Sequence, residues 1–215
     1  MRSGSVIGAL SPFAWFKSNV GVYQSNGGAA CAVHDPVGYW MDQSGNGHHL
    51  TQAGAAKKPL VDVLSADVFV AFDGVLNYIG ADMTLAQPIT VYAVVNHTTI
   101  DGLIFVGTSG DNLGIAGSSF KINAGTVLTD GAYFATWVIL KAVFNGASSS
   151  VGIAGTMTTG NAGTNSLGGI YLGADKVGGL PTQMNLGELV VFNRVMSGAD
   201  DTAVVADLNA RWVSE

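Results

Sequence analysis

Short runs of apolar residues, separated by glycine-rich polar turns, dominate the chain. The clearest run is 89–96, Ile-Thr-Val-Tyr-Ala-Val-Val-Asn, whose β-branched and aromatic residues predict a strand. Because its apolar positions are nearly continuous, we expect this strand at the centre of a sheet that is buried on both faces. A second long strand is predicted over 137–145, and Asn145–Gly146 at its end favours a hairpin. The pattern therefore predicts an all-β fold.

The C-terminal segment changes period. After a last apolar strand at 186–192, the residues from Ser197 to Asp200 are similar to a helix capping box. Val205, Leu208 and Trp212 are then spaced so that they share one face of a helix. We expect a short C-terminal helix that docks on the sheet.

The remaining segments are interpreted from their composition. Residues 1–11 are small and mostly polar and are predicted to form an N-terminal arm, which precedes a single domain over 12–215. The stretch 155–169 is rich in glycine, threonine, asparagine and serine and is predicted to be a loop. All-β sandwiches of this length are routinely one domain.

Composition narrows the class of protein. Apolar residues make up 48% of the chain and charged residues 11%, so a sizeable core is expected and disorder is not. The formal net charge of −6 argues against a nucleic-acid partner. No stretch reaches the ~18 apolar residues that a membrane span needs. Cys31 is the single cysteine, which excludes an intrachain disulfide and a cysteine metal cluster.

One polar stretch, residues 39–52, stands out as a motif. From residue 40 it reads Trp-x-Asp-Gln-Ser-Gly-Asn-Gly-His-His-Leu-Thr-Gln, and its Ser-Gly and Asn-Gly pairs favour consecutive tight turns. Buried-type residues flank it, so we expect a strand that ends in a compact turn and hands the chain to a second strand.

This motif, together with Lys58-Pro59, Phe72-Asp73-Gly74 and the run Gly-Glu-Leu-Val-Val-Phe-Asn-Arg-Val-Met-Ser at 187–197, resembles the laminin-G-like, concanavalin A-like lectin/glucanase superfamily. The resemblance implies a two-sheet antiparallel jelly-roll sandwich in which 187–197 contains the last strand and leads into the C-terminal helix. It implies little about activity, because this superfold hosts lectins, hydrolases, lyases and adhesion modules.

The catalytic residues of the family's enzymes are not evident. The glucanase branch uses a Glu-x-Asp-x-x-Glu strand, whereas this chain has only two glutamates, Glu188 and Glu215, without a second carboxylate at that spacing. A lyase would need a Tyr/His pair with Arg or Gln, and no motif ties such residues together. The sequence therefore predicts that the chain is not an enzyme, with a polysaccharide hydrolase or lyase as the least favoured alternative. Glu188 is interpreted as a structural strand residue.

Calcium is the metal that the turns could hold, because it prefers oxygen ligands from Asp, Asn and backbone carbonyls. The candidates are Asp42, Asn46, Asp73 and Asp111. The alternative is that these side chains cap their own backbone, as Asp and Asn in turns usually do.

Sugar binding would need exposed aromatic rings beside polar groups. Tyr23, Tyr78 and Tyr133 lie beside predicted loops and are the candidate carbohydrate-binding residues. Trp40 and Trp212 match core positions of the family that the chain resembles, so we expect both to be packing residues.

The resulting hypothesis is a non-enzymatic structural or adhesion protein of a bacteriophage-like virion. Its partners would be other virion proteins or further copies of itself, and in addition a host surface glycan. The apolar run at 6–10 is too short for a signal-peptide core, which favours this location, and residues 1–11 would serve as a tether. The alternative is a cellular carbohydrate-binding module that acts outside the cell or at its surface.

Overall fold

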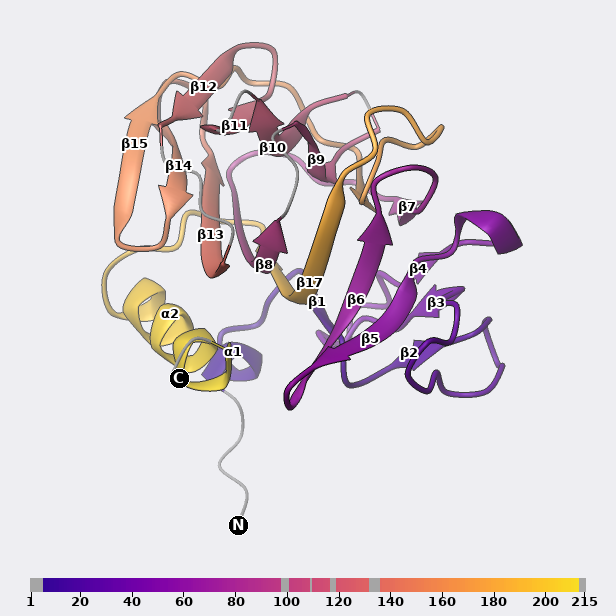
Figure 1. Ribbon diagram of the computed structural model, residues 1–215. Coiled ribbons are helices and arrows are strands. Elements are labelled where there is room, and N and C mark those ends of the chain that lie inside the picture. Colours follow the sequence, from indigo (N-terminus) through magenta and orange to yellow (C-terminus); the bar gives the residue numbers. More distant parts are fainter. Residues whose placement is uncertain (1–5, 98–100, 109, 117–118, 132–135, 213–215) are drawn as a thin grey trace.

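The computed structural model describes residues 6–97, 101–108, 110–116, 119–131 and 136–212, and it is an antiparallel β-sandwich with a helical layer on one side (Figure 1). Within these residues the strands form one sheet of eight strands and one of nine. The prediction of an all-β, two-sheet sandwich with a short C-terminal helix is confirmed.

The eight-stranded sheet is built around strand β8. Its strands follow the order β15, β14, β13, β8, β17, β6 and β5, and β1 also pairs with β17. Every side chain of β8 except Asn96 is buried, so the prediction of a central strand buried on both faces is confirmed. The strands of this sheet are β1 (Ala14–Lys17), β5 (Leu60–Leu64), β6 (Asp67–Asp73), β8 (Ile89–His97), β13 (Trp137–Phe144), β14 (Ser149–Ile153), β15 (Thr156–Gly160) and β17 (Gln183–Phe192).

The nine-stranded sheet lies against it, in the order β12, β11, β10, β9, β16, β7, β4, β3 and β2. The large residues of the core lie between the two sheets and are fully buried, among them Phe16, Trp40, Phe105 and Phe120. Trp40 is therefore a packing residue, as predicted. The strands of this sheet are β2 (Val22–Tyr23), β3 (Tyr39–Trp40), β4 (Leu50–Thr51), β7 (Ile79–Asp82), β9 (Gly102–Val106), β10 (Asn112–Ala116), β11 (Ser119–Asn123), β12 (Val127–Asp130) and β16 (Gly169–Leu172).

Two helices cover the other face of the eight-stranded sheet, α1 (Val6–Ala9) and α2 (Gly198–Trp212) (Figure 1). Val204 and Leu208 of α2 pack with Tyr92 and Phe192 of the sheet in a second apolar cluster. The segment predicted as a polar arm joins this cluster, because Ile7 is fully buried in it. None of the helices that the structure describes is long and apolar enough to cross a membrane.

One predicted loop is a strand. Residues Thr156–Gly160 form β15, which pairs with β14 at the edge of the sheet. The composition is misleading because threonine, a β-branched residue, suits an exposed edge strand as well as a loop. The predicted turn after β13 contains a short 3₁₀ helix, Gly146–Ser148, before β14 begins.

Candidate functional site

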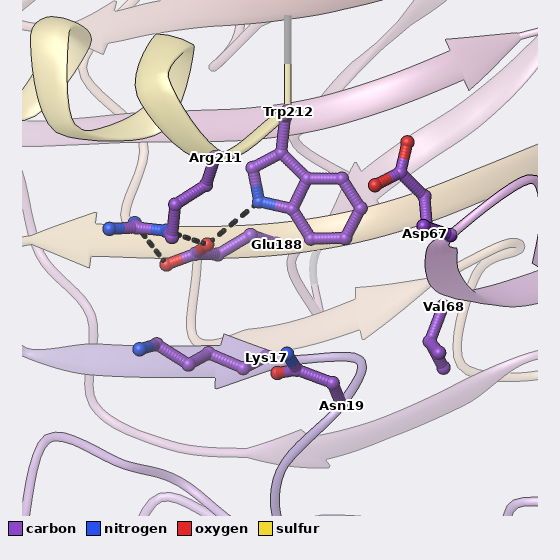
Figure 2. Close-up of a pocket in the computed structure, with 8 residues that line it drawn as sticks. Lys17, Asn19, Asp67, Val68, Glu188, Arg211 and Trp212 are labelled. Carbon is purple, nitrogen blue, oxygen red and sulfur yellow. Dashed lines mark hydrogen bonds and ion pairs between the residues drawn. The ribbon is translucent and has the colours of Figure 1, made fainter. Parts of the chain in front are cut away.

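A polar hollow of about 240 Å³ lies where the sheet meets the C-terminal end of α2 (Figure 2). We call it the Lys17 hollow. It is lined by Lys17, Asn19, Ala66, Asp67, Val68, Glu188, Arg211 and Trp212.

Strand pairing explains why a hollow forms there. Two strands pair in succession with β17 on the side away from β8: β6 pairs with Gln183–Leu186, and β1 pairs with the stretch from Glu188 to Val191. The end of β1 and the beginning of β6 therefore face each other beside β17. Lys17 is the last residue of β1, and its register partner is Glu188, so the two share one face of the sheet.

Trp212 closes the hollow from the helix side. A Cβ atom at Gly187 would lie 2.6 Å from the Trp212 ring, so only glycine lets the indole rest this closely on β17. The ring also lies beside Trp137, with a centroid distance of 5.6 Å. Trp212 is a packing residue, as predicted, and part of it also lines the Lys17 hollow.

Glu188 is fully used by the protein itself. Its carboxylate is 1% exposed and accepts hydrogen bonds from Trp15 Nε1 at 2.6 Å and from Trp212 Nε1 at 3.0 Å. Arg211 donates from Nε at 3.2 Å and from Nη2 at 2.9 Å. Figure 2 shows Glu188 held by Arg211 and Trp212. This arrangement fastens the end of α2 to the sheet and agrees with the interpretation of Glu188 as structural.

Lys17 and Asp67 have free side chains. Within the described residues, neither the Lys17 ammonium nor the Asp67 carboxylate forms a side-chain hydrogen bond or an ion pair. The Lys17 Nζ lies 4.1 Å from the centroid of the Trp15 ring, a cation–π contact that positions it. Burial lowers the pKa of Lys17 below its ordinary value, and the nearby Glu188 carboxylate partly offsets this effect. The hollow is thus lined by three polar side chains, and Figure 2 shows the Lys17 ammonium on the side of Glu188 and Arg211, with Asp67 at the opposite end.

A second hollow, of about 300 Å³, adjoins the first and differs in polarity. Asn19 and Val68 line both hollows, so the two are neighbours. We call the second one the Val22 hollow. It is lined by Ser18, Asn19, Gly21, Val22, Tyr23, Ala30, Cys31, Ala32, Val33, Val61 and Val68.

The three predicted sugar-binding tyrosines do not form one platform. Tyr23 lines the Val22 hollow, with its ring centroid 6.1 Å from that of Tyr39. Tyr78 packs instead against a separate cluster that contains Tyr171, and Lys57 Nζ lies 5.4 Å from its ring centroid. Tyr133 lies outside the described residues.

The predicted calcium ligands in the 42–46 turn are engaged with the chain itself. Asp42 Oδ1 accepts the backbone N–H groups of Trp15 and Ser44, each at 2.9 Å. Its Oδ2 accepts the His48 N–H at 3.0 Å and the Ser44 hydroxyl at 2.7 Å. Asn46 Nδ2 donates to the Phe13 carbonyl at 2.9 Å. These bonds fasten the turn over the beginning of β1.

Asp73 and Asp111 lie in other turns. Asp73 Oδ1 accepts the backbone N–H groups of Val75, Leu76 and Asn77 at 2.8–3.0 Å. Asp111 is buried: its Oδ1 accepts from Asn165 Nδ2 at 3.2 Å, and its Oδ2 has no partner in the described part of the chain. Burial raises the pKa of Asp111.

Asp42 and Asp73 thus cap their own backbone, which the sequence analysis left open as the alternative to calcium binding. In the described ranges, no three His, Cys, Asp or Glu side chains are grouped closely enough to hold a metal ion. Calcium binding by these residues stays a prediction.

No motif in the sequence marks the Lys17 hollow. Lys17, Asn19 and Asp67 belong to no motif, and they are separated from Glu188 and Arg211 by more than half of the chain. Only the pairing of β1 and β6 with the same strand brings them together. A lysine that ends a short apolar strand, opposite the one internal glutamate, is the signal that a correct register would have revealed.

Comparison with known proteins shows similarity in structure and no match in sequence. No family model and no curated protein matches the sequence, so the laminin-G-like resemblance has no support from that side. A Trypanosoma rangeli sialidase in complex with sialic acid superposes with a TM-score of 0.58 and 15% identity, over 85% of this chain and 34% of the sialidase. The chain therefore spans about a third of that enzyme's length.

Two further structures extend this similarity. A mutant of HCR/D, a clostridial toxin binding domain, gives a TM-score of 0.62 at 12% identity, over 94% of this chain and 53% of that chain. A mutant α-L-arabinofuranosidase soaked with 4-nitrophenyl α-L-arabinofuranoside gives 0.55 at 15% identity, over 80% of this chain and 50% of that chain. These TM-scores show a shared β-rich fold, and at such low identities the likeness shows the fold alone.

The comparison corrects one prediction. The expectation that the chain is not an enzyme is contradicted, because the sialidase and the arabinofuranosidase that share its fold are enzymes. The missing glucanase motif argued only against one catalytic arrangement, and this fold also occurs in enzymes of other kinds. None of these structures points to a bacteriophage particle, and the virion role stays a prediction without support.

Proposed function

We propose that this chain is a carbohydrate-binding β-sandwich domain and that the Lys17 hollow holds a sugar ring. The observation that carries the proposal is the pair of side chains that the protein leaves free in the hollow. Lys17 and Asp67 both line the hollow, at opposite ends of it, and neither forms a side-chain hydrogen bond or ion pair within the described residues, while the neighbouring Glu188 is saturated.

The chemistry of the hollow suits a polyhydroxylated ring. Each sugar hydroxyl both donates and accepts a hydrogen bond, so it pairs equally well with the Lys17 ammonium, the Asn19 amide and the Asp67 carboxylate. A polar group buried on binding must find such a partner, since an unpaired one costs about 1–3 kcal/mol. The exposed part of Trp212 adds an apolar wall at the same place.

The size of the hollow limits the ligand. Its volume of about 240 Å³ lies below the range of about 300–1,000 Å³ that is usual for drug-sized ligands. We therefore expect it to hold one sugar ring, with any further part of the ligand outside it. The solved structures that share this fold, a sialidase with sialic acid and an arabinofuranosidase with an arabinofuranoside, add support at the level of the fold.

A glycan array tests the proposal. The wild-type chain should show specific hits, and the Lys17→Met and Asp67→Ala variants should lose them, because each removes one of these polar groups. Lys121→Gln is the matched control, since Lys121 lies on β11, outside both hollows, and its loss should leave the hits unchanged. A blank array for the wild type, or hits that survive both variants, would contradict the proposal.

A further inference from the structure

The Val22 hollow is an apolar opening at the side of the sandwich. It lies between β2, the edge strand of one sheet, and β5, the edge strand of the other. Val22 and Val61, one from each of these strands, belong to the core and form part of its wall. Aliphatic and small side chains from residues 30–33 complete the lining, and Val33 is 42% exposed.

The opening is fixed by backbone bonds. The N–H of His34 donates to the Val61 carbonyl at 2.7 Å, and the N–H of Cys31 donates to the Val22 carbonyl at 3.0 Å. The segment 31–34 is therefore tied to both edge strands, so the opening does not depend on a free loop. An apolar group of a ligand that covers this surface removes it from water, which favours binding.

The two hollows share two lining residues. Asn19 and Val68 line both, and the Ser18 hydroxyl donates to the Val68 carbonyl there, which ties the end of β1 to β6. Lys17 and Asp67 line only the first hollow, and Val22 and Val61 line only the second. The lining thus becomes more apolar from the Lys17 hollow to the Val22 hollow.

We propose that the ligand is an amphiphile: its sugar occupies the Lys17 hollow, and an apolar group attached to that sugar occupies the Val22 hollow. This inference rests on the proposed function. The occupant of the apolar side is an alkyl or acyl chain attached to the bound sugar, because the two hollows share lining residues and a sugar alone leaves the Val22 hollow open to water. A glycolipid and an acylated polysaccharide present the same chemistry.

Paired probes test the inference. Methyl and n-octyl β-D-glucopyranoside, and the same pair of galactosides, have identical sugars and differ only in the chain. Below the micelle concentration, the octyl glycoside should bind at least tenfold more tightly than its methyl partner, because each buried methylene contributes enough for about a fourfold gain. Isothermal titration gives both affinities.

Two variants locate the effect. Ala32 and Val33 are exposed residues of the apolar lining, so Ala32→Trp, which fills the hollow, and Val33→Asp, which makes it polar, should fold normally. Each should remove the octyl advantage and leave methyl glycoside binding unchanged. Lys17→Met should weaken both glycosides while the ratio between them persists.

Cys31 supplies an independent readout, because it lines the Val22 hollow and is the only cysteine in the chain. Octyl glycoside should slow the alkylation of Cys31 by iodoacetamide at least fivefold, and methyl glycoside should not. Free octanol at the same concentration should protect less, since it lacks the sugar.

The outcomes separate the two proposals. Equal affinities of methyl and octyl glycosides overturn the amphiphile inference and leave sugar binding in place. Octanol that protects Cys31 as well as the octyl glycoside also overturns it, because the apolar hollow then acts without the sugar. A blank glycan array together with no binding of any glycoside refutes the proposed function itself. Once a glycan has been identified, its glycolipid and acylated polysaccharide forms distinguish the natural source.

Discussion

The turn at residues 42–48 and the Lys17 hollow use their charged groups in opposite ways. In the turn, Asp42 gives both of its oxygens to the chain's own donors. In the hollow, Glu188 is saturated in the same manner, but Lys17 and Asp67 form no side-chain hydrogen bond or ion pair within the described part of the chain. The motif at residues 39–52 thus stabilises the fold, while Lys17 and Asp67, which line the hollow, belong to no motif.

The largest expected effect comes from the saturated group of the hollow. Glu188→Gln puts an amide nitrogen where one oxygen accepts an indole N–H, while Arg211 keeps its ion pair with Asp207, so the free energy of unfolding should fall by about 3 kcal/mol, the cost of a buried donor without an acceptor. Urea denaturation measures this change. Asp200→Asn, at an exposed position in the first turn of α2, should change it by less than about 0.5 kcal/mol. A loss below about 1 kcal/mol for Glu188→Gln would show that α2 is held by its apolar face alone.

The motif turn should give the next largest effect. Asp42→Ala removes the acceptor of three backbone N–H groups and one hydroxyl, and we expect a loss of about 2–3 kcal/mol. Asp42→Asn should recover part of it, since the amide oxygen still accepts. If a folded Asp42→Asn variant also lost binding to the glycan array, Asp42 would contribute to ligand binding and would not only stabilise the turn.

The free groups should affect affinity and leave stability nearly unchanged. Lys17→Met should weaken sugar binding about tenfold, the effect of one charge-assisted hydrogen bond, and shift the free energy of unfolding by no more than about 1 kcal/mol. Titration calorimetry and urea denaturation on the same preparation provide both numbers. A large loss of stability would place Lys17 among the structural groups.

The capping aspartates make stability depend on pH in a known direction. Burial by itself raises the pKa of Asp73, but the backbone N–H groups of Leu76, Val75, Asn77 and Asp73 together hold it below its ordinary value. A carboxyl whose pKa is lower in the folded state stabilises above its unfolded pKa, and this contribution is lost as the pH falls through the folded pKa. Asp73→Asn should therefore lose less stability between pH 7 and pH 3 than the wild type, measured by thermal melting.

Calcium should have the smallest effect. Because Asp42 and Asp73 are engaged with backbone donors, millimolar calcium should shift the melting temperature by less than about 1 °C relative to EDTA. A rise of several degrees that Asp111→Asn abolishes would instead establish calcium binding at the buried oxygen that lacks a partner.

Local patterns predicted the fold well where they were strong. The apolar run of β8 and the spacing of Val205, Leu208 and Trp212 predicted a central strand and a docked helix, because burial on a sheet or helix leaves a period in the sequence. The edge strand β15 was missed, since an exposed strand of threonines leaves no such period.

Most residues of the candidate site could not be predicted from the sequence. Tyr23 was predicted and does line a hollow, but Lys17, Asn19 and Asp67 were not predicted. Their meeting depends on which strands pair with β17 and in what register, a long-range property that composition and short motifs do not encode.

The packing of α1 against α2 has a practical consequence for the topology of the chain. The described residues nearest the two ends of the sequence lie together in one helical layer (Figure 1). A short linker could therefore join them, and the chain could be reopened at Gly155, a turn glycine between β14 and β15 with open space around it. Such a circular permutant would keep every strand pair, and it would allow a fluorescent reporter to be inserted far along the sequence from Lys17 and Trp212.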